Sequence, residues 1–538
     1  MKSSDEARRK ATHPPLRVPL PRGDLAQIPL QWRGGRRPGW VLLVLSSGNC
    51  PSLNPKPRGS PFRAEKRIRW AGALLTVLLA VAVLMPSGLM AQDDLDEVLE
   101  RFDDEGDETD IGDVLSGFED EALPVDASAN VPRDTFWRLT GAASLGPSFN
   151  VAHDTPAADA ADYRGLTRLR LKLQLDLDVS LPGSWKVLVS GSGFHDFAYL
   201  IKGRDDFTDD VLDAYEQEIE LREAYIQGTL LPNLDLRFGR QIVNWGRADN
   251  SRVLDVLNPL DLREPGMVDI EDLRLPLVMT RLDYLLGKWT ATGIAIHEIR
   301  FNKEPVFGSE FFPLDRPAPA EEIPDNTLKN TELAAAINGF GVLSGLDVSL
   351  HFARFFDDQA HVEREGTAFK RRHSRLSMFG TGASFVKSSW LFKAELAYFD
   401  GLRFFSVAEE KSRIDALFGV EYTGISNTTL ALDVVNQRII DFEAALENPP
   451  DNASENTAQY VLTWRSNLRR ETVHIVGVVS LFGWKVDDGA FERLSVEYDW
   501  TDALSVSTGV VLYQSGDNPL FKQASDSDRI FAEARYSF

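Results

Sequence analysis

Residues 168–181, RLRLKLQLDLDVSL, alternate a hydrophobic residue with a polar or charged one at every step. Leucine or valine occupies the odd-numbered positions, and mainly arginine, lysine and aspartate occupy the even-numbered ones. A period of two is typical of a β-strand with one apolar face and one polar face. At about 13 residues the run is longer than most strands of soluble proteins. The pattern therefore favours a strand that crosses a membrane.

Similar alternating runs recur between residue 136 and the C-terminus. They fall at residues 185–193, 234–238, 291–297, 346–355, 392–399, 414–422, 429–435, 473–481, 494–498, 504–512 and 530–538. Backbone groups left unpaired in lipid each cost several kcal/mol, so only a sheet whose first and last strands meet is tolerated there. One closed sheet would explain all of these runs.

The connections between the runs alternate in length. Tight turns are expected near residues 182–183, 232–233, 287–288, 344–345, 387–389, 426–427, 470–471 and 501–502, and longer loops near 153–163, 201–214, 246–276, 301–329, 357–372, 401–410, 441–456, 485–489 and 515–527. Short periplasmic turns and long extracellular loops are typical of outer-membrane barrels. The prediction is an all-β, transmembrane outer-membrane β-barrel of about 18 antiparallel strands, within a range of 16 to 20.

Composition restricts the alternatives. The chain has 538 residues and a formal net charge of −23, and residues 1–91 hold 15 Lys and Arg against 4 Asp and Glu, so the remainder is strongly acidic. An acidic body makes nucleic acid an improbable partner, because binding it needs clustered positive charge. The body has no apolar run of the roughly 18 to 20 residues that a membrane helix needs. The single cysteine, Cys50, leaves no thiol downstream for a disulfide framework or a Cys-ligated metal.

The N-terminal region has the features of an export signal. Residues 66–69 are basic, residues 71–84 are apolar, and residues 86–91 end in small residues before an acidic start. These are the three parts of a secretory signal, so we expect a signal peptide at 66–91 with cleavage after Ala91. A retained signal anchor is the alternative. Residues 1–65 are rich in Pro, Arg and Gly, and are interpreted as an over-extended or disordered extension, or else as a genuine long leader.

An acidic segment at 92–134 separates the signal from the barrel at 135–538. It contains two Val-Leu-x-x-Phe repeats, formed by Val98, Leu99 and Phe102 and by Val114, Leu115 and Phe118. The segment has too little apolar surface for a core of its own. The repeats could lie on one side of a short helix that docks into the groove of a periplasmic partner. A solvated acidic linker is the alternative.

Two further features agree with a barrel in the outer membrane. Five tryptophans sit beside predicted periplasmic strand ends, where amphipathic rings favour the headgroup level; they are Trp137, Trp185, Trp289, Trp390 and Trp500. The chain also ends on an alternating strand that places Tyr536 two residues before the terminal Phe538. This ending resembles the C-terminal signal of Gram-negative outer-membrane proteins. It implies recognition by the barrel-assembly machinery and insertion among outer-membrane lipid and lipopolysaccharide.

The longest loop follows a distinctive strand end. Residues 234–247 read LDLRFGRQIVNWGR, and Asn258-Pro259-Leu260-Asp261 follow. The run resembles a family of uncharacterised Gram-negative outer-membrane barrels, typified by Gly-Arg-Gln-x-Val-x-Trp-Gly and then Asn-Pro-Leu-Asp. The resemblance implies association with RND-superfamily exporters of the MMPL type and a role in moving lipid-like molecules. It is closest over residues 234–285, and the acidic repeats also look like N-terminal segments of that group.

Loops of this length in compact proteins usually have a task. We expect the loop to fold inward as a partial plug, because Asn258-Pro259 initiates a turn. The functional hypothesis is a constriction or substrate platform built from Arg240, Gln241, Trp245, Asn258 and Asp261. The alternative is that these residues only anchor the loop to the barrel wall.

A stripe of charge is expected inside the lumen. Arg168, Arg170 and Lys172 lie on the ionic face of the first quoted strand, and they could face a second group formed by Glu218, Glu220 and Arg222. Opposite charges across a lumen tune selectivity. The alternative is that these charges satisfy one another and stiffen the wall.

An enzyme is not indicated. The sequence has no Gly-x-Ser-x-Gly elbow and no His-Glu-x-x-His pair, and its acidic pairs lack the glycine-punctuated pattern of a calcium loop. We expect no metal and no cofactor. Three functions remain: a transport or envelope-trafficking barrel for a hydrophobic or amphipathic molecule, working with an RND-type exporter; a substrate-selective porin for small polar solutes; and a structural or adhesive surface barrel.

Overall fold

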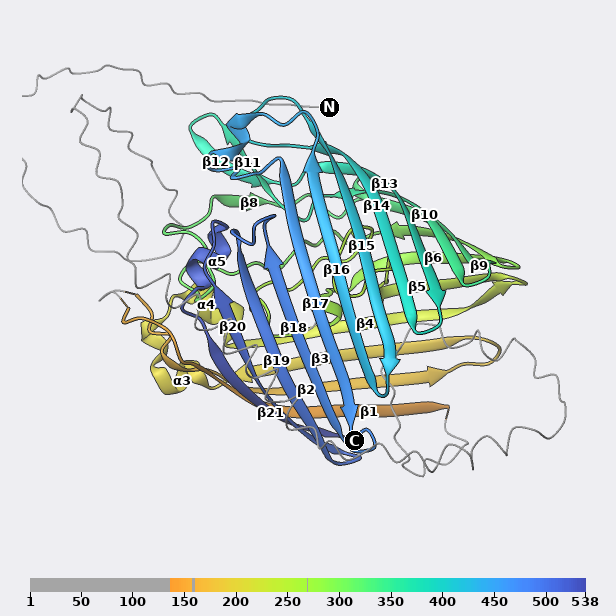
Figure 1. Ribbon diagram of the computed structural model, residues 1–538, viewed down its shortest axis with the longest axis horizontal. Coiled ribbons are helices and arrows are strands. Elements are labelled where there is room, and N and C mark those ends of the chain that lie inside the picture. Colours follow the sequence, from red (N-terminus) through yellow and green to blue (C-terminus); the bar gives the residue numbers. More distant parts are fainter. Residues whose placement is uncertain (1–135, 157–159, 269) are drawn as a thin grey trace, which may run out of the picture. The chain divides into compact units, whose positions relative to one another are not determined.

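The barrel is built from one long antiparallel sheet. The computed structural model describes residues 136–156, 160–268 and 270–538. Eighteen strands join into this sheet: β1 (Trp137–Asn150), β2 (Gly165–Ser180), β3 (Lys186–Asp196), β4 (Gln217–Leu231), β5 (Leu234–Gln241), β6 (Leu277–Leu286), β7 (Trp289–Ile296), β9 (Glu332–Leu343), β10 (Leu346–Phe356), β13 (Arg375–Lys387), β14 (Trp390–Leu402), β15 (Lys411–Ile425), β16 (Thr428–Ile439), β17 (Asn456–Leu468), β18 (Val473–Phe482), β19 (Gly489–Thr501), β20 (Leu504–Gln514) and β21 (Arg529–Ser537). Figure 1 shows them side by side.

The remaining elements lie in the long connections. A small sheet contains β8 (Ala320–Glu322), β11 (His361–Glu365) and β12 (Ala368–Arg372), and the helices are α3 (Ala198–Lys202), α4 (Asp209–Tyr215) and α5 (Pro519–Ala524). Short 3₁₀ turns are η2 (Arg204–Asp206), η3 (Ile270–Leu273), η4 (Leu328–Asn330) and η5 (Ala444–Glu447). Among the helices that the structure describes, none has the length and apolar character needed to cross a bilayer.

The sheet closes where the first strand meets the last. β1 pairs antiparallel with β21, with Leu145 opposite Ala534 and Ser148 opposite Phe531. The ladder is completed by Phe538, which donates its backbone N–H to the carbonyl of Gly141 and accepts the N–H of Gly141, each at 2.9 Å. Neither end strand is left with a free edge, as lipid requires. The predicted class and strand number are confirmed.

The alternation of residues 168–181 has the predicted spatial meaning. The odd-numbered leucines of β2 point outward and remain exposed, with Leu171 at 47% and Leu173 at 46%. Other strands add large apolar side chains to the same outer surface, including Leu350 at 60% and Phe379 at 57%. The charged even-numbered residues of β2 line the lumen. An apolar exterior around an inner face that carries charge, as on β2, is the architecture of an outer-membrane barrel.

The connections alternate as the sequence predicts. Within the described residues, eight tight turns lie at one end of the barrel and nine longer connections at the other. Asn233 and Asn427 stand in two of the tight turns with φ of 66° and 53°, the left-handed conformation that short hairpin turns need. The five tryptophans singled out above all lie near the tight-turn end, and Trp500 is 68% exposed. Figure 1 shows α3, α4, α5 and the small sheet gathered at the opposite end.

The closing contact predicts the effect of a packing change. A Cβ added at Gly141 would lie 2.8 Å from the ring of Phe538 and 2.8 Å from the carbonyl oxygen of Gln174. Gly141→Leu should therefore destabilise the folded barrel by about 1–3 kcal/mol through overpacking. The measurement is urea unfolding followed by heat-modifiable mobility in gels. Gly293→Leu is the matched control, because a Cβ there meets nothing within 4 Å; equal midpoints for both variants would contradict the proposed closure.

Candidate functional site

The loop between β5 and β6, residues 242–276, folds into the lumen. Its apolar side chains are almost fully buried, with Trp245 at 4%, Leu254 at 0% and Leu257 at 3%. They pack against inward-facing residues of the consecutive strands from β6 to β16, which are Leu277, Met279, Ile294, Ile296, Ala334, Ala336, Ala353, Phe355, Leu376, Met378, Ala397, Phe399, Leu402, Leu417 and Val435. The lumen on this side is filled by an apolar core, as the partial-plug prediction requires.

The loop also reaches deep towards the tight-turn end. Arg247 lies 4.0 Å from Asp347, the second residue of β10 after its tight turn. The next contact is an ion pair between Asp249 and Lys393, the fourth residue of β14. Because both partners stand close to tight turns, the loop extends through most of the length of the lumen.

Asn258 joins the two ends of the loop. Its Oδ1 accepts the backbone N–H of Val243 at 2.9 Å, and its Nδ2 donates to the carbonyl of Leu275 at 2.9 Å. Gln241 lies beside it and donates its Nε2 to the carbonyl of Met279 at 3.1 Å. Both side chains are fully buried. They satisfy backbone groups that would otherwise be stranded in an apolar interior.

A carboxylate of the wall holds the deepest turn of the loop. Glu395 on β14 is 4% exposed and accepts three backbone N–H groups. Its Oε1 accepts from Arg247 and from Ala248, the latter at 3.0 Å, and its Oε2 accepts from Leu254 at 3.1 Å. The sequence analysis did not identify this residue. A single glutamate in an alternating strand gives no sign that it binds backbone amides about 140 residues earlier.

The side chain of Trp245 is buried and does not face the lumen as the predicted platform would require. Its ring packs edge-on against His351 of β10, with centroids 5.0 Å apart and an interplanar angle of 77°. At 4% exposure it presents no face to a solute. Together with Gln241 and Asn258 it fits the anchoring interpretation rather than the substrate platform.

Arg240 and Asp261 bind charged neighbours. Arg240 donates both hydrogen bonds of its Nη1 to the carboxylate of Glu298, at 2.5 and 2.6 Å. Glu298 belongs to the next long connection, residues 297–331, so Arg240 fixes the start of that loop to β5. Asp261 binds Arg263 at 2.5 Å. Neither residue is an unpaired charge available to a solute.

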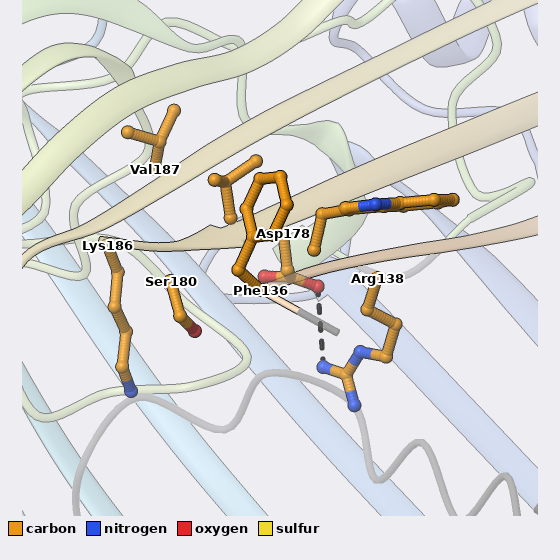
Figure 2. A pocket seen from close by; sticks show the side chains of 8 residues that line it. Phe136, Arg138, Asp178, Ser180, Lys186 and Val187 are labelled. Atoms are coloured by element: carbon orange, nitrogen blue, oxygen red, sulfur yellow. Dashed lines mark hydrogen bonds and ion pairs between the residues drawn. The ribbon is translucent and has the colours of Figure 1, made fainter. Parts of the chain in front are cut away.

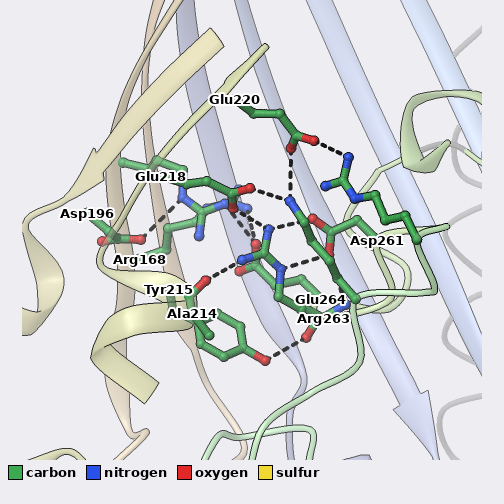
Figure 3. A network of polar contacts seen from close by, with 12 residues as sticks. Arg168, Asp196, Ala214, Tyr215, Glu218, Glu220, Asp261, Arg263 and Glu264 are labelled. Carbon is green, nitrogen blue, oxygen red and sulfur yellow. Dashed lines mark hydrogen bonds and ion pairs between the residues drawn. The ribbon is translucent and has the colours of Figure 1, made fainter. Parts of the chain in front are cut away.

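The dipeptide Arg263-Glu264 connects the loop to the charged stripes of the wall. Glu264 lies 2.9 Å from Arg170 and 3.6 Å from Arg168 on β2. Arg263 lies 2.7 Å from Glu218 on β4. Figure 3 shows Arg168, Glu218, Arg263 and Glu264 within one network of polar contacts.

The two predicted stripes therefore do not neutralise each other directly. β3 separates β2 from β4, because β2 pairs with β3 and β3 pairs with β4. The two glutamates take most of their partners from the loops: Lys303 binds Glu218 and Glu220, the second at 2.9 Å, and Arg300 lies 2.5 Å from Glu220. Arg240 of β5 lies 3.7 Å from Glu220. Lys172 and Arg222 face a cavity of about 180 Å³ between this wall and the loop.

The first part of the connection 297–331 also folds inward, which the sequence analysis did not predict. Glu310 accepts a hydrogen bond from Asn150 of β1 and forms an ion pair with Arg529 of β21, each at 2.7 Å. Phe311 is 2% exposed and packs with a cluster around Tyr513 and Phe531. We call residues 242–276 and 297–331 the plug loops. Both contact β4, through Arg263 of the first loop and Lys303 of the second, and the second also contacts β1 and β21.

A second cavity lies at the tight-turn end, near the start of β1. Its volume is about 300 Å³, and its lining is Phe136, Trp137, Arg138, Asp178, Val179, Ser180, Lys186 and Val187. Figure 2 shows Arg138 joined to Asp178, at 3.3 Å.

The signal peptide at 66–91 and the partner motif at 92–134 lie outside the described residues.

The charged groups of the site carry no sign of metal chemistry. Within the described residues, no three His, Cys, Asp or Glu side chains come together in a way that could hold a metal ion. The arrangement can instead exclude water, hold loops in place and present charge to a passing solute.

A comparison with protein families matches residues 71–538 to a family described as "Protein of unknown function (DUF1302)". The chain belongs to this family. No curated protein matches the chain.

Several solved outer-membrane proteins are similar in structure. OccK11 (OpdR) of Pseudomonas aeruginosa is 8% identical with a TM-score of 0.43, over 75% of this chain and 96% of the other. OccAB3 of Acinetobacter baumannii is 9% identical with a TM-score of 0.43, over 75% and 99%. OmpT of Vibrio cholerae without its loop L8 is 11% identical with a TM-score of 0.34, over 75% and 99%. Such distant likenesses carry no information about cargo.

The contacts of Asn258 predict that it keeps the first plug loop inside the lumen. Asn258→Ala removes hydrogen bonds to Val243 and Leu275 and leaves buried backbone groups unpaired, at a cost of about 1–3 kcal/mol for each group. The loop should then leave the lumen more often, and planar-bilayer conductance should rise. Asn448→Ala, at an exposed position in a surface loop, is the control. A conductance equal to that of the wild type would show that Asn258 does not hold the loop.

The ion pairs of Glu264 predict a pH dependence. Burial alone would raise the pKa of Glu264, but the guanidinium groups of Arg170 and Arg168 lower it to about 2. Since the folded pKa lies below the usual value, its stabilisation is complete above about pH 4.5 and is lost as the pH falls through about 2. Glu264→Gln should weaken the loop by about 3–5 kcal/mol and raise conductance at neutral pH.

The pH profile of the difference between wild type and Glu264→Gln is the measurement. The gap in conductance should stay constant from pH 7 to about pH 5 and shrink only in stronger acid. A gap that closes near pH 6 would show that the carboxylate of Glu264 is not held in these ion pairs.

Proposed function

We propose that the barrel moves a hydrophobic or amphipathic molecule, lipid-like in character, across the outer membrane together with an RND-type inner-membrane exporter. The observation that carries this proposal is the filling of the lumen by the two plug loops. A barrel of about 18 strands is wide enough for an aqueous channel unless something fills it. Here one loop extends towards the tight-turn end and the other binds β1 and β21.

The chemistry of the plug differs on its two flanks. On the side of β6 to β16 it is apolar, with Val243, Leu254 and Leu257 buried against the wall. On the side of β2 and β4 it is ionic, through Arg263 and Glu264. A molecule that displaces or passes the loops meets both surfaces, and an amphipathic molecule can satisfy both.

The exporter is supported by features of the sequence. The motif at 239–246 resembles that of barrels associated with RND-type exporters, and the two Val-Leu-x-x-Phe repeats have the spacing of a short docking helix. In the proposed arrangement, the repeats recruit a periplasmic component that delivers or receives the cargo at the tight-turn end.

A selective porin for small polar solutes is the second candidate. It is favoured by the inner surface near the seam, where Ser144 of β1, Ser505 of β20 and Arg535 of β21 stand opposite one another. A polar lane of this kind could pass small solutes beside the plug loops. Steady ion conductance that saturates with a sugar or acid would favour the porin, whereas a barrel closed to ions would favour the trafficking function.

Envelope lipidomics of a deletion strain tests the proposed function. The expected result is the accumulation or loss of one class of hydrophobic or amphipathic compound, restored by the wild-type gene. The matched control is complementation with a closure variant such as Gly141→Leu, which should not restore the compound if it fails to assemble. An unchanged lipid composition, together with slower uptake of polar nutrients, would contradict the proposal and support the porin.

The acidic repeats provide a separate prediction. Deleting residues 94–121 should leave barrel assembly intact, because the described sheet begins at Trp137. Cargo transfer should fall to the level of the deletion strain if the repeats recruit a periplasmic component. Heat-modifiable mobility checks assembly, and the lipid readout above checks transfer. Unchanged transfer would contradict the recruitment by this segment.

A further inference from the structure

The 180 Å³ cavity has an unusual balance of charge. It is bounded by the inner wall of β2 to β4 and by the first plug loop, and its lining is Arg168, Arg170, Lys172, Ser192, Phe194, Tyr215, Glu218, Glu220, Arg222, Asp261, Arg263, Glu264, Met267, Val268, Asp272, Leu273, Arg274, Leu275 and Pro276. Cations outnumber carboxylates among these residues.

Most of the cations are already paired. Arg168 and Arg170 share Glu264. Arg263 binds Glu218 and Asp261, and Arg274 lies 3.0 Å from Asp255. Within the part of the chain that the structure describes, Lys172 and Arg222 make no ion pair and no hydrogen bond through their side chains. Asp272 lines the same cavity without coming within ion-pair distance of either.

The two free cations lie on the same inner wall, two strands apart, and both line the cavity. Lys172 of β2 stands opposite Phe194 of β3. On the other side of β3, Gly191 pairs with Leu221 and Ser190 pairs with Glu223, so Arg222 is the extra residue of a bulge. Bulges redirect side chains and are frequent at functional sites. Ser192 of β3, which has a short side chain, also lines the cavity.

Apolar surface adjoins these cations. Phe194 of the wall lines the cavity, and so do Met267, Val268 and Leu273 of the loop. Val268 remains 42% exposed. An apolar side chain exposed inside a lumen is poorly solvated and gains by contact with another apolar group.

We propose that Lys172 and Arg222 form a subsite for the anionic head of an amphipathic molecule, whose apolar part lies against Met267, Val268 and Leu273. The inference rests on the proposed function and names the class of cargo: amphipathic anions with a small head such as a carboxylate. Two half-buried charges of the same sign repel each other, and an anion placed between them relieves that repulsion. The volume of about 180 Å³ is below that of sites for drug-sized ligands, so it fits a head group and a short apolar segment.

The test is a binding measurement on the full chain in lipid nanodiscs at low salt. Hexanoate is the probe, and hexanol and hexylammonium are its neutral and cationic counterparts. The wild type should bind hexanoate in preference to both. The double variant Lys172→Gln with Arg222→Gln should lose about tenfold in hexanoate affinity, the usual cost of removing a charged hydrogen bond, and keep its weak affinity for hexanol.

The matched control removes the same charges elsewhere in the lumen. Lys186 and Arg535 are exposed residues on the inner face of β3 and β21, outside the cavity. Lys186→Gln with Arg535→Gln should bind hexanoate as the wild type does. An equal loss of hexanoate affinity in both double variants would contradict a local site and indicate attraction by the overall charge of the lumen. Unchanged hexanoate affinity in the first double variant would overturn the proposal.

Charge reversal separates a lost site from a damaged barrel. Lys172→Glu with Arg222→Glu should shift the preference from hexanoate to hexylammonium, an outcome that misfolding cannot produce. Retained preference for hexanoate would overturn the proposal. Because binding is measured without transport, an intact subsite beside an unchanged lipid composition in the deletion strain would contradict the proposed function alone.

Discussion

The backbone ladder between β1 and β21 is the contact on which the rest of the structure depends. It removes the last free edge of an 18-stranded sheet, and without it unpaired N–H and C=O groups would face hydrocarbon. Closure also fixes which way each side chain points. Once the seam is set, the leucines of β2 face lipid and its arginines face the lumen.

A closed sheet of this size encloses a wide lumen, which the protein has to fill. The plug loops fill it by bringing backbone and charge into the lumen, and each needs a partner there. Asn258 and Glu395 satisfy backbone amides of the first loop, and Glu264 satisfies two arginines of the wall. The wall and the loops are therefore complementary, and Lys172 and Arg222 stand out because that pairing does not include them.

The sequence predicts the wall far better than the site. Strands and turns follow from local alternation and from turn residues such as Asn233, so their number and order could be read directly. The inward folding of residues 242–276 could also be predicted, from the turn that Asn258 begins. No local pattern predicts the second plug loop, because Glu310 and Arg529 lie 219 residues apart and meet only after the barrel closes. The expected pairing between the stripes of β2 and β4 missed the loop residues that come between them for the same reason.

Spin-label accessibility along β2 tests the central claim most directly. Single cysteines at positions 168–181, in a chain whose only native cysteine, Cys50, has been replaced, carry the label in reconstituted liposomes. The account predicts a period of two, with odd positions open to oxygen in the lipid and even positions open at most to a water-soluble nickel chelate. A period near 3.6, or uniform access to the chelate, would contradict a membrane barrel.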